Sequence, residues 1–195
     1  MTVSTTLQLR CESSDLWLKA VLDNFDDFLL DHAANEKKAA SVALNLAAHY
    51  PDKPELVAAA IDLAIEELCH YREVFGLIRE RQLTLPADKK DTYVNQLRSA
   101  VRNGREDYFL DRLLVAAVVE ARGLERFAKI AAALPAGSLQ SFYQTIARSE
   151  ARHAELFLSL AQRYFETERI STRLQTLLDL EAQIVVLLPV RAALH

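Results

Sequence analysis

Apolar residues recur three and four residues apart along most of the chain, which is the spacing of one face of an α-helix. Breaks in this pattern divide it into four long stretches and one shorter stretch near the end. We expect the first stretch to bend or split near Asn24. The expected helices run from about Ser14 to Tyr50, Pro54 to Arg81, Asp107 to Ala133, Ser138 to Thr167, and Ser171 to Leu188.

Residues that stop helices lie between these stretches rather than inside them. Pro51 separates the first helix from the second, and Pro135 and Gly137 separate the third from the fourth. Such short links make each pair of helices an antiparallel hairpin. A connector from Leu83 to Arg105, with a short helix at about Asp91 to Arg102, joins the hairpins. The pattern predicts an all-α four-helix bundle of two antiparallel hairpins, with the fifth helix covering it.

The composition fits this architecture. The chain has 195 residues, so we expect one domain spanning residues 1–195. Only 4 Gly and 5 Pro occur, which favours long helices over many short strands and turns. The longest apolar run, Leu113 to Val119, is much shorter than the roughly 18 residues of a membrane span. Because Met1 to Arg10 also shows no basic-then-apolar leader pattern, we expect a cytoplasmic protein.

Charge and cysteine content exclude some classes of function. The cysteines, Cys11 and Cys69, are too few for a disulfide scaffold or a four-thiolate metal site. A formal net charge of −4 argues against general coating of nucleic acids, but it leaves room for a local basic patch. The connector offers such a patch, with a surplus of positive charge that is either a solvated face or a nucleic-acid contact. Its cations are Lys89, Lys90, Arg98, Arg102 and Arg105, against Asp88 and Asp91.

Two Glu-x-x-His tetrapeptides carry the candidate chemistry. They begin at Glu67 and Glu150, and each places a carboxylate and an imidazole one turn apart on one helix face. A further glutamate precedes each motif in the partner helix of its hairpin. The separation between Glu36 and Glu67 is almost the same as that between Glu120 and Glu150. The two halves of the chain therefore repeat the same arrangement.

The four glutamates lie at the same height in their hairpins. Glu36 precedes Pro51 by the same sequence separation as Glu120 precedes Pro135. Glu67 and Glu150 likewise follow Pro54 and Gly137 by equal separations. At 1.5 Å per residue, each glutamate is roughly 20 Å from its turn. Because each also falls on the apolar face of its helix, we expect all four to meet in one layer of the core.

Four carboxylates and two imidazoles in an apolar core would cost many kcal/mol as bare ions, and a pair of divalent metal ions removes that cost. The carboxylate-rich set suits iron or manganese better than structural zinc. It matches the ferritin-like di-iron or di-manganese arrangement of two glutamates and two Glu-x-x-His motifs. The alternative is a set of solvated helix charges with two incidental histidines. The predicted catalytic and metal-binding residues are Glu36, Glu67, His70, Glu120, Glu150 and His153.

His32 lies one turn before Glu36 and has two interpretations. It is either a hydrogen-bond partner of that ligand or an ordinary surface or core histidine. Cys69 lies inside the first motif, where a small core residue is a better interpretation than a thiolate ligand.

The strings that contain these residues resemble one particular family, the tRNA 2-methylthio-N6-isopentenyladenosine hydroxylases. The similarity covers roughly Trp17 to Phe165, and departures occur at Asn35 and at Gly123–Leu124, where the family has other residues. None of these three is a proposed ligand. The resemblance implies that the six residues above bind two iron ions and that the substrate is the modified adenosine next to the anticodon of tRNA. The strings are Leu30–Ala40, Glu66–His70, Val119–Phe127 and Ser149–His153.

The resemblance also implies a reaction and its partners. Two iron ions would use O2 as co-substrate to hydroxylate the isopentenyl side chain. The two electrons must come from an external donor, a reductase or a ferredoxin, because the two cysteines cannot make an iron–sulfur centre. An acidic protein that holds tRNA must concentrate positive charge locally. We expect Lys89, Lys90, Arg98 and Arg102 to contact phosphates, with Lys37, Lys38 and Arg126 as the next candidates.

Two other functions remain open at this point. A ferritin-like iron oxidase or peroxide-scavenging protein would use the same six ligands without an organic substrate. A non-catalytic four-helix interaction module would bind no metal.

Overall fold

The computed structural model describes residues 7–195, which form seven α-helices and no strand. The part of the leader expectation that falls on residues 1–6 lies outside the described residues. Across residues 7–195, no helix has the length and apolar character needed to cross a membrane. The helices are α1 (Asp15–Asp23), α2 (Phe25–His49), α3 (Pro54–Glu80), α4 (Thr92–Ser99), α5 (Arg105–Ala133), α6 (Ser138–Tyr164) and α7 (Thr167–Leu187).

The chain divides into two compact units. One contains Leu16–Lys89 and Val190–Leu194, and here it is called the α2–α3 unit. The other contains residues 7–15, Lys90–Pro189 and His195, and it is called the α5–α6 unit. The single domain expected from the sequence stays a prediction.

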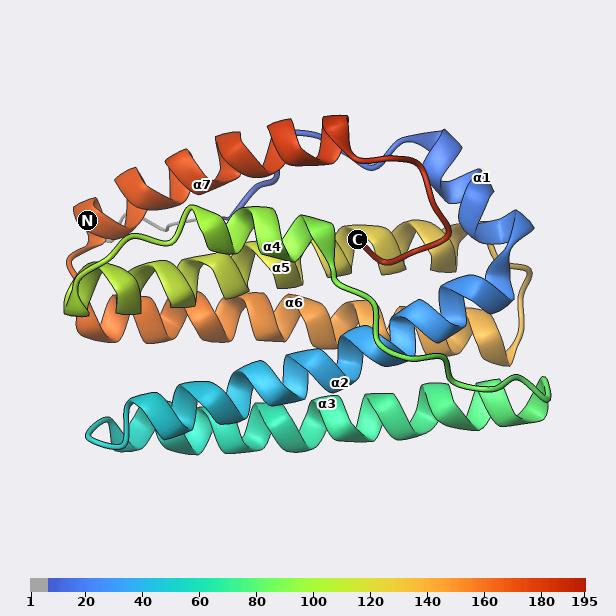
Figure 1. Ribbon diagram of the computed structural model, residues 1–195, viewed down its shortest axis with the longest axis horizontal. Helices are drawn as coiled ribbons and strands as arrows, with labels where there is room; N and C mark the ends of the chain where they lie inside the picture. Colours follow the sequence, from blue (N-terminus) through green and yellow to red (C-terminus); the bar gives the residue numbers. More distant parts are fainter. Residues whose placement is uncertain (1–6) are drawn as a thin grey trace. The chain divides into compact units, whose positions relative to one another are not determined.

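In the α2–α3 unit, α2 and α3 form an antiparallel hairpin (Figure 1). The predicted break near Asn24 is confirmed, since α1 ends at Asp23 and α2 begins at Phe25. The Asn24 side-chain amide donates to the Ala20 carbonyl at 3.0 Å, so it closes the end of α1. The Trp17 indole donates to the Ala193 carbonyl at 2.9 Å, which fastens residues near the C-terminus to α1.

In the α5–α6 unit, α5 and α6 form the second antiparallel hairpin, and α7 and α4 pack beside it. The fifth expected helix is thus present as α7, which starts at Thr167 rather than Ser171. The helix α4 is shorter than expected at both ends. Asp91 caps its N-terminus by accepting a hydrogen bond from the Val94 amide at 2.9 Å. At the other end, the Arg102 amide donates to Asp111 instead of continuing the helix.

A buried ion pair that the sequence analysis missed joins α5 to α7. Arg122 and Glu181 are both fully buried, and their side chains pair through two hydrogen bonds of 2.7 and 3.0 Å. The Tyr93 hydroxyl of α4 donates to the same carboxylate at 3.0 Å. A signal was present, because Glu181 lies on the apolar face of α7 with Leu174, Leu178 and Ile184. Breaking such a buried pair is strongly destabilising, so it fixes the position of α5.

Candidate metal centre

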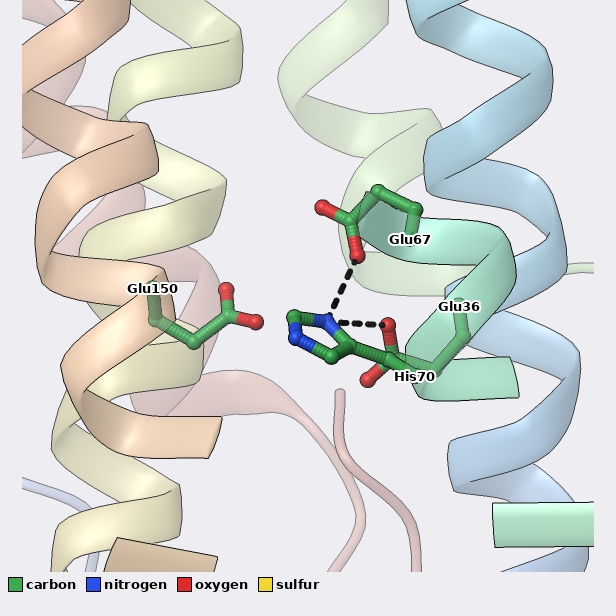
Figure 2. Close-up of side chains that lie close together, drawn as sticks. All are labelled: Glu36, Glu67, His70 and Glu150. Carbon is green, nitrogen blue, oxygen red and sulfur yellow. Dashed lines mark hydrogen bonds and ion pairs between the residues drawn. The ribbon is translucent and has the colours of Figure 1, made fainter. Parts of the chain in front are cut away.

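The α2–α3 unit contains the first group of predicted ligands. Glu36 of α2 and Glu67 and His70 of α3 are all buried, and each offers a ligand atom within 4.8 Å of the others. Figure 2 shows the Nδ1 atom of the His70 ring facing both carboxylates, 3.3 Å from Glu67 Oε2 and 3.6 Å from Glu36 Oε2. Glu150, the fourth side chain drawn there, belongs to the other unit. We call Glu36, Glu67 and His70 the α2–α3 cluster.

His32 is a partner of this cluster. It is fully buried, and its Nε2 lies 2.6 Å from Glu36 Oε1. The ring therefore donates a hydrogen bond to the carboxylate and fixes its direction. Of the two interpretations of His32, the structure supports the hydrogen-bond partner of a predicted ligand.

The protonation equilibria of the cluster show how much negative charge it concentrates. Burial raises the pKa of Glu36, but hydrogen bonds from His32 and His70 outweigh it, so the pKa lies well below its usual range. For His70, burial alone would lower the pKa, because it disfavours the charged imidazolium. Hydrogen bonds to Glu36 and Glu67 outweigh burial and raise the pKa of His70 to about 10. Without a metal, an imidazolium cation neutralises part of the carboxylate charge.

This leads to a pH prediction for the metal-free protein. Since the folded pKa of His70 is raised above its ordinary 6.5, its contribution to stability is complete below pH 6.5 and lost as pH rises toward about 10. We expect the free energy of unfolding to fall over this window more steeply in the metal-free protein than in its His70→Gln variant. Denaturant unfolding at several pH values measures the difference. If the difference in free energy of unfolding between the two proteins stays constant from pH 6.5 to 10, His70 is not protonated in the metal-free protein.

The α5–α6 unit contains the second group, Glu120 of α5 with Glu150 and His153 of α6. All three are buried, and their ligand atoms also lie within 4.8 Å of one another. His153 Nδ1 is 3.7 Å from Glu120 Oε2. Gly123 provides space here, because a Cβ at this position would lie 3.0 Å from Glu150 Oε2. We call Glu120, Glu150 and His153 the α5–α6 cluster.

The two clusters have the same composition but different surroundings. The position four residues before Glu36 holds His32, whereas the position four residues before Glu120 holds Ala116. Gly123 follows Glu120 by three residues, and the corresponding position after Glu36 is Ala39. The internal repeat therefore extends to the ligand types and not to the residues that support them.

The donor sets of both clusters fit iron. Each brings two buried carboxylates and one imidazole together. Such oxygen and nitrogen donors suit divalent metal ions such as iron and manganese. The six predicted residues thus lie in two groups of three, one in each unit. That the two groups form a single dinuclear centre stays a prediction.

The remaining candidates have mixed outcomes. Arg126 is only 4% exposed and donates from Nε to Ser13 Oγ at 2.9 Å, so its assignment as a reserve phosphate contact is wrong. Arg102 holds Asp111 through hydrogen bonds of 2.7 to 3.2 Å, so part of its charge is balanced within the fold, and its phosphate contact stays a prediction. The Cys69 thiol is partly exposed, and its Sγ lies 3.8 Å from Arg72 Nη2.

Comparison with solved structures confirms the predicted fold class. The chain is similar to "Protein 43 with aldehyde deformylating oxygenase activity from Synechococcus", a ferritin-like fold, with a TM-score of 0.91 and 32% sequence identity. The similarity covers 96% of this chain and 93% of that one. The all-α ferritin-like architecture expected from the helical pattern is therefore correct.

Comparison with known sequences finds two bacterial relatives, both named tRNA 2-(methylsulfanyl)-N(6)-isopentenyladenosine(37) hydroxylase. The relative from Pseudomonas putida is 34% identical over 177 residues, covering 91% of this chain and 86% of the relative. The relative from Salmonella typhimurium is 33% identical over 132 residues, covering 68% of this chain and 48% of the relative. A family model described as tRNA-(MS2IO6A)-hydroxylase (MiaE) matches residues 1–195. The chain belongs to this family of tRNA hydroxylases.

Proposed function

We propose that the two clusters bind two iron ions as one dinuclear centre, with which the chain uses O2 to hydroxylate the isopentenyl group of 2-(methylsulfanyl)-N6-isopentenyladenosine in tRNA. The family assignment makes the chain a tRNA-modifying hydroxylase. The observation that supports the metal centre is the pair of buried clusters, each with two glutamates and one histidine.

Charge balance supports two divalent ions. Four carboxylates carry four negative charges, and two ferrous ions carry four positive charges, so the loaded site would be neutral in the core. Buried carboxylates without compensating charge are costly, whereas a neutral metal–carboxylate set is compatible with burial. The similar distances of the four glutamates from their hairpin turns, roughly 20 Å each, support one shared layer.

The residues around the iron ligands have separable roles. His32 orients the Glu36 carboxylate through its 2.6 Å hydrogen bond. His70 must lose its proton before its nitrogen can bind a metal, and so iron loading displaces that proton. When bound, the two ferrous ions supply the site for O2 reduction and part of the reducing equivalents. Within each hairpin, the buried apolar side chains around the cluster exclude water from its ligand atoms.

The reaction also determines what must come from outside. Insertion of one atom of O2 into a carbon–hydrogen bond, with the other atom leaving as water, consumes two electrons and two protons. Only two cysteines occur, and neither is in a cluster that could hold an iron–sulfur centre. An external reductase or ferredoxin therefore completes the cycle.

The test is a single turnover with isotopically labelled O2. Reduced, iron-loaded protein is mixed with labelled O2 and tRNA bearing the isopentenyl modification, and the nucleosides are analysed by mass spectrometry. We expect one labelled oxygen atom on the prenyl group, and none on matched tRNA that lacks it. If hydrogen peroxide is consumed rapidly while the nucleoside stays unlabelled, the ferritin-like scavenger is the correct function.

A further inference from the structure

Lysines distant in sequence meet on the surface of the α2–α3 unit. Lys37 and Lys38 are adjacent residues of α2, and both contact the connector that follows α3. Figure 1 shows this connector crossing α2. Lys37 Nζ pairs with Asp88 at 2.8 Å, and Lys38 Nζ donates to the Lys89 carbonyl at 3.0 Å. Two successive residues of α2 thus hold two successive residues of the connector. Lys90 follows Lys89 directly in the chain and is the first residue of this stretch of the α5–α6 unit. We call Lys37, Lys38 and Lys89, together with this next residue Lys90, the lysine surface.

The lysine surface has an excess of positive charge that folding does not require. Asp88 balances only one of its four cations. The bond from Lys38 to a carbonyl neutralises no charge. Within residues 7–195, the ammonium groups of Lys89 and Lys90 form no ion pair, and both residues are exposed. Like charges held close together cost free energy unless an anion binds between them.

Two residues of the lysine surface lie on the same turn of α2 as Glu36 of the α2–α3 cluster. Lys37 and Lys38 directly follow Glu36, which places them within about 3 Å of it along the helix axis. Glu36 is buried, whereas both lysines reach the solvent. A polyanion bound by these lysines would therefore lie roughly one helix diameter, about 10 Å, from a predicted iron ligand.

We infer that the lysine surface binds backbone phosphates of the tRNA next to the modified adenosine, an inference that rests on the proposed function. Lysine ammonium groups act as point charges for phosphate, and such contacts set the position of a nucleic acid without reading its sequence. The contacts with Asp88 and the Lys89 carbonyl hold the connector before the tRNA arrives, which lowers the entropic cost of binding. Proximity to Glu36 favours the substrate over an acidic electron-donor protein, because the substrate itself must reach the iron ligands.

The experiment compares two charge reversals in the iron-loaded protein. In the test variant, Lys89→Glu and Lys90→Glu are combined, since neither side chain supports the fold. The control variant combines Lys19→Glu and Arg79→Glu, which are exposed positions elsewhere and cause the same change in net charge. Binding of isopentenyl-modified tRNA is measured by fluorescence anisotropy at several salt concentrations. Circular dichroism and iron analysis check that both variants fold and load alike.

We expect the test variant to bind tRNA about tenfold more weakly at low salt, with a salt slope reduced by about 0.7 to 0.9 per lost phosphate contact. The control variant should bind like the unmodified protein. Equal affinity and slope in the two variants would overturn the inference and leave the proposed function intact. Normal tRNA binding combined with loss of reduction by an external donor would assign the surface to that protein. Failure of the unmodified protein to bind tRNA would instead contradict the proposed function.

Discussion

Replacement of Glu120 by alanine is expected to produce a folded protein that no longer hydroxylates tRNA. Glu120 is buried on α5, 3.7 Å from His153, and is one of only two carboxylates in the α5–α6 cluster. Substitution of a residue that only hydrogen-bonds to a metal ligand lowers metal affinity or activity about 10- to 100-fold. We therefore expect loss of a ligand itself to lower single-turnover hydroxylation at least about 100-fold. Iron analysis should show incomplete loading.

The folded state should survive this substitution. Removing a buried carboxylate also removes the cost of its desolvation, and alanine is the best helix former. Without metal, the free energy of unfolding of the variant should therefore lie within about 1 kcal/mol of that of the unmodified protein. The control is Glu155→Ala, which removes an exposed glutamate from α6 and should keep full activity. A Glu120→Ala protein that retains two irons and normal turnover would contradict the ligand assignment. An unfolded variant would show that the metal is needed for folding.

Helical periodicity was sufficient to predict most of the fold. The long helices carry continuous apolar faces, and their ends are marked by Pro51, Pro54, Pro135 and Gly137, so α2, α3, α5 and α6 lie close to their predicted ranges. The N-terminal end of α4 depends on a local cap by Asp91, whereas its C-terminal end depends on the hydrogen bond from Arg102 to Asp111 of α5, which no local pattern encodes. The early start of α7 reflects a polar first turn that periodicity of apolar residues does not detect.

The candidate ligands were predictable for a similar reason. A glutamate or histidine on an apolar helix face is unfavourable to bury without a partner, and the spacing of residues along the chain is enough to identify it. The supporting residues were harder to predict, because their roles depend on contacts across helices. Gly123 is an example, since only the packing of α5 against α6 shows that its missing side chain makes room for Glu150. The bonds that join Lys37 and Lys38 to the connector span 51 residues and have no sequence signature.

His32→Ala is expected to affect one cluster and leave the other unchanged. His32 donates to Glu36 at 2.6 Å in a fully buried position, so its removal leaves a carboxylate oxygen without that hydrogen bond. An unsatisfied buried polar group costs about 1–3 kcal/mol, and outer-shell substitutions weaken metal binding about 10- to 100-fold. The α5–α6 cluster has Ala116 at the corresponding position, so the substitution removes no side chain from that cluster. The variant should therefore retain about one iron per chain when iron is limiting.

Titration with ferrous iron, followed by Mössbauer spectroscopy, would distinguish selective from uniform loss. His49→Ala is the matched control, because His49 is an exposed histidine of the same helix whose Nδ1 lies 3.2 Å from the Asn45 carbonyl. His32→Gln supplies a second comparison, since an amide can still donate to Glu36 and should restore part of the lost affinity. Equal weakening of both iron sites would show that the clusters load as a unit. Unchanged iron binding in a folded His32→Ala protein would show that the hydrogen bond to Glu36 serves the core and not the metal.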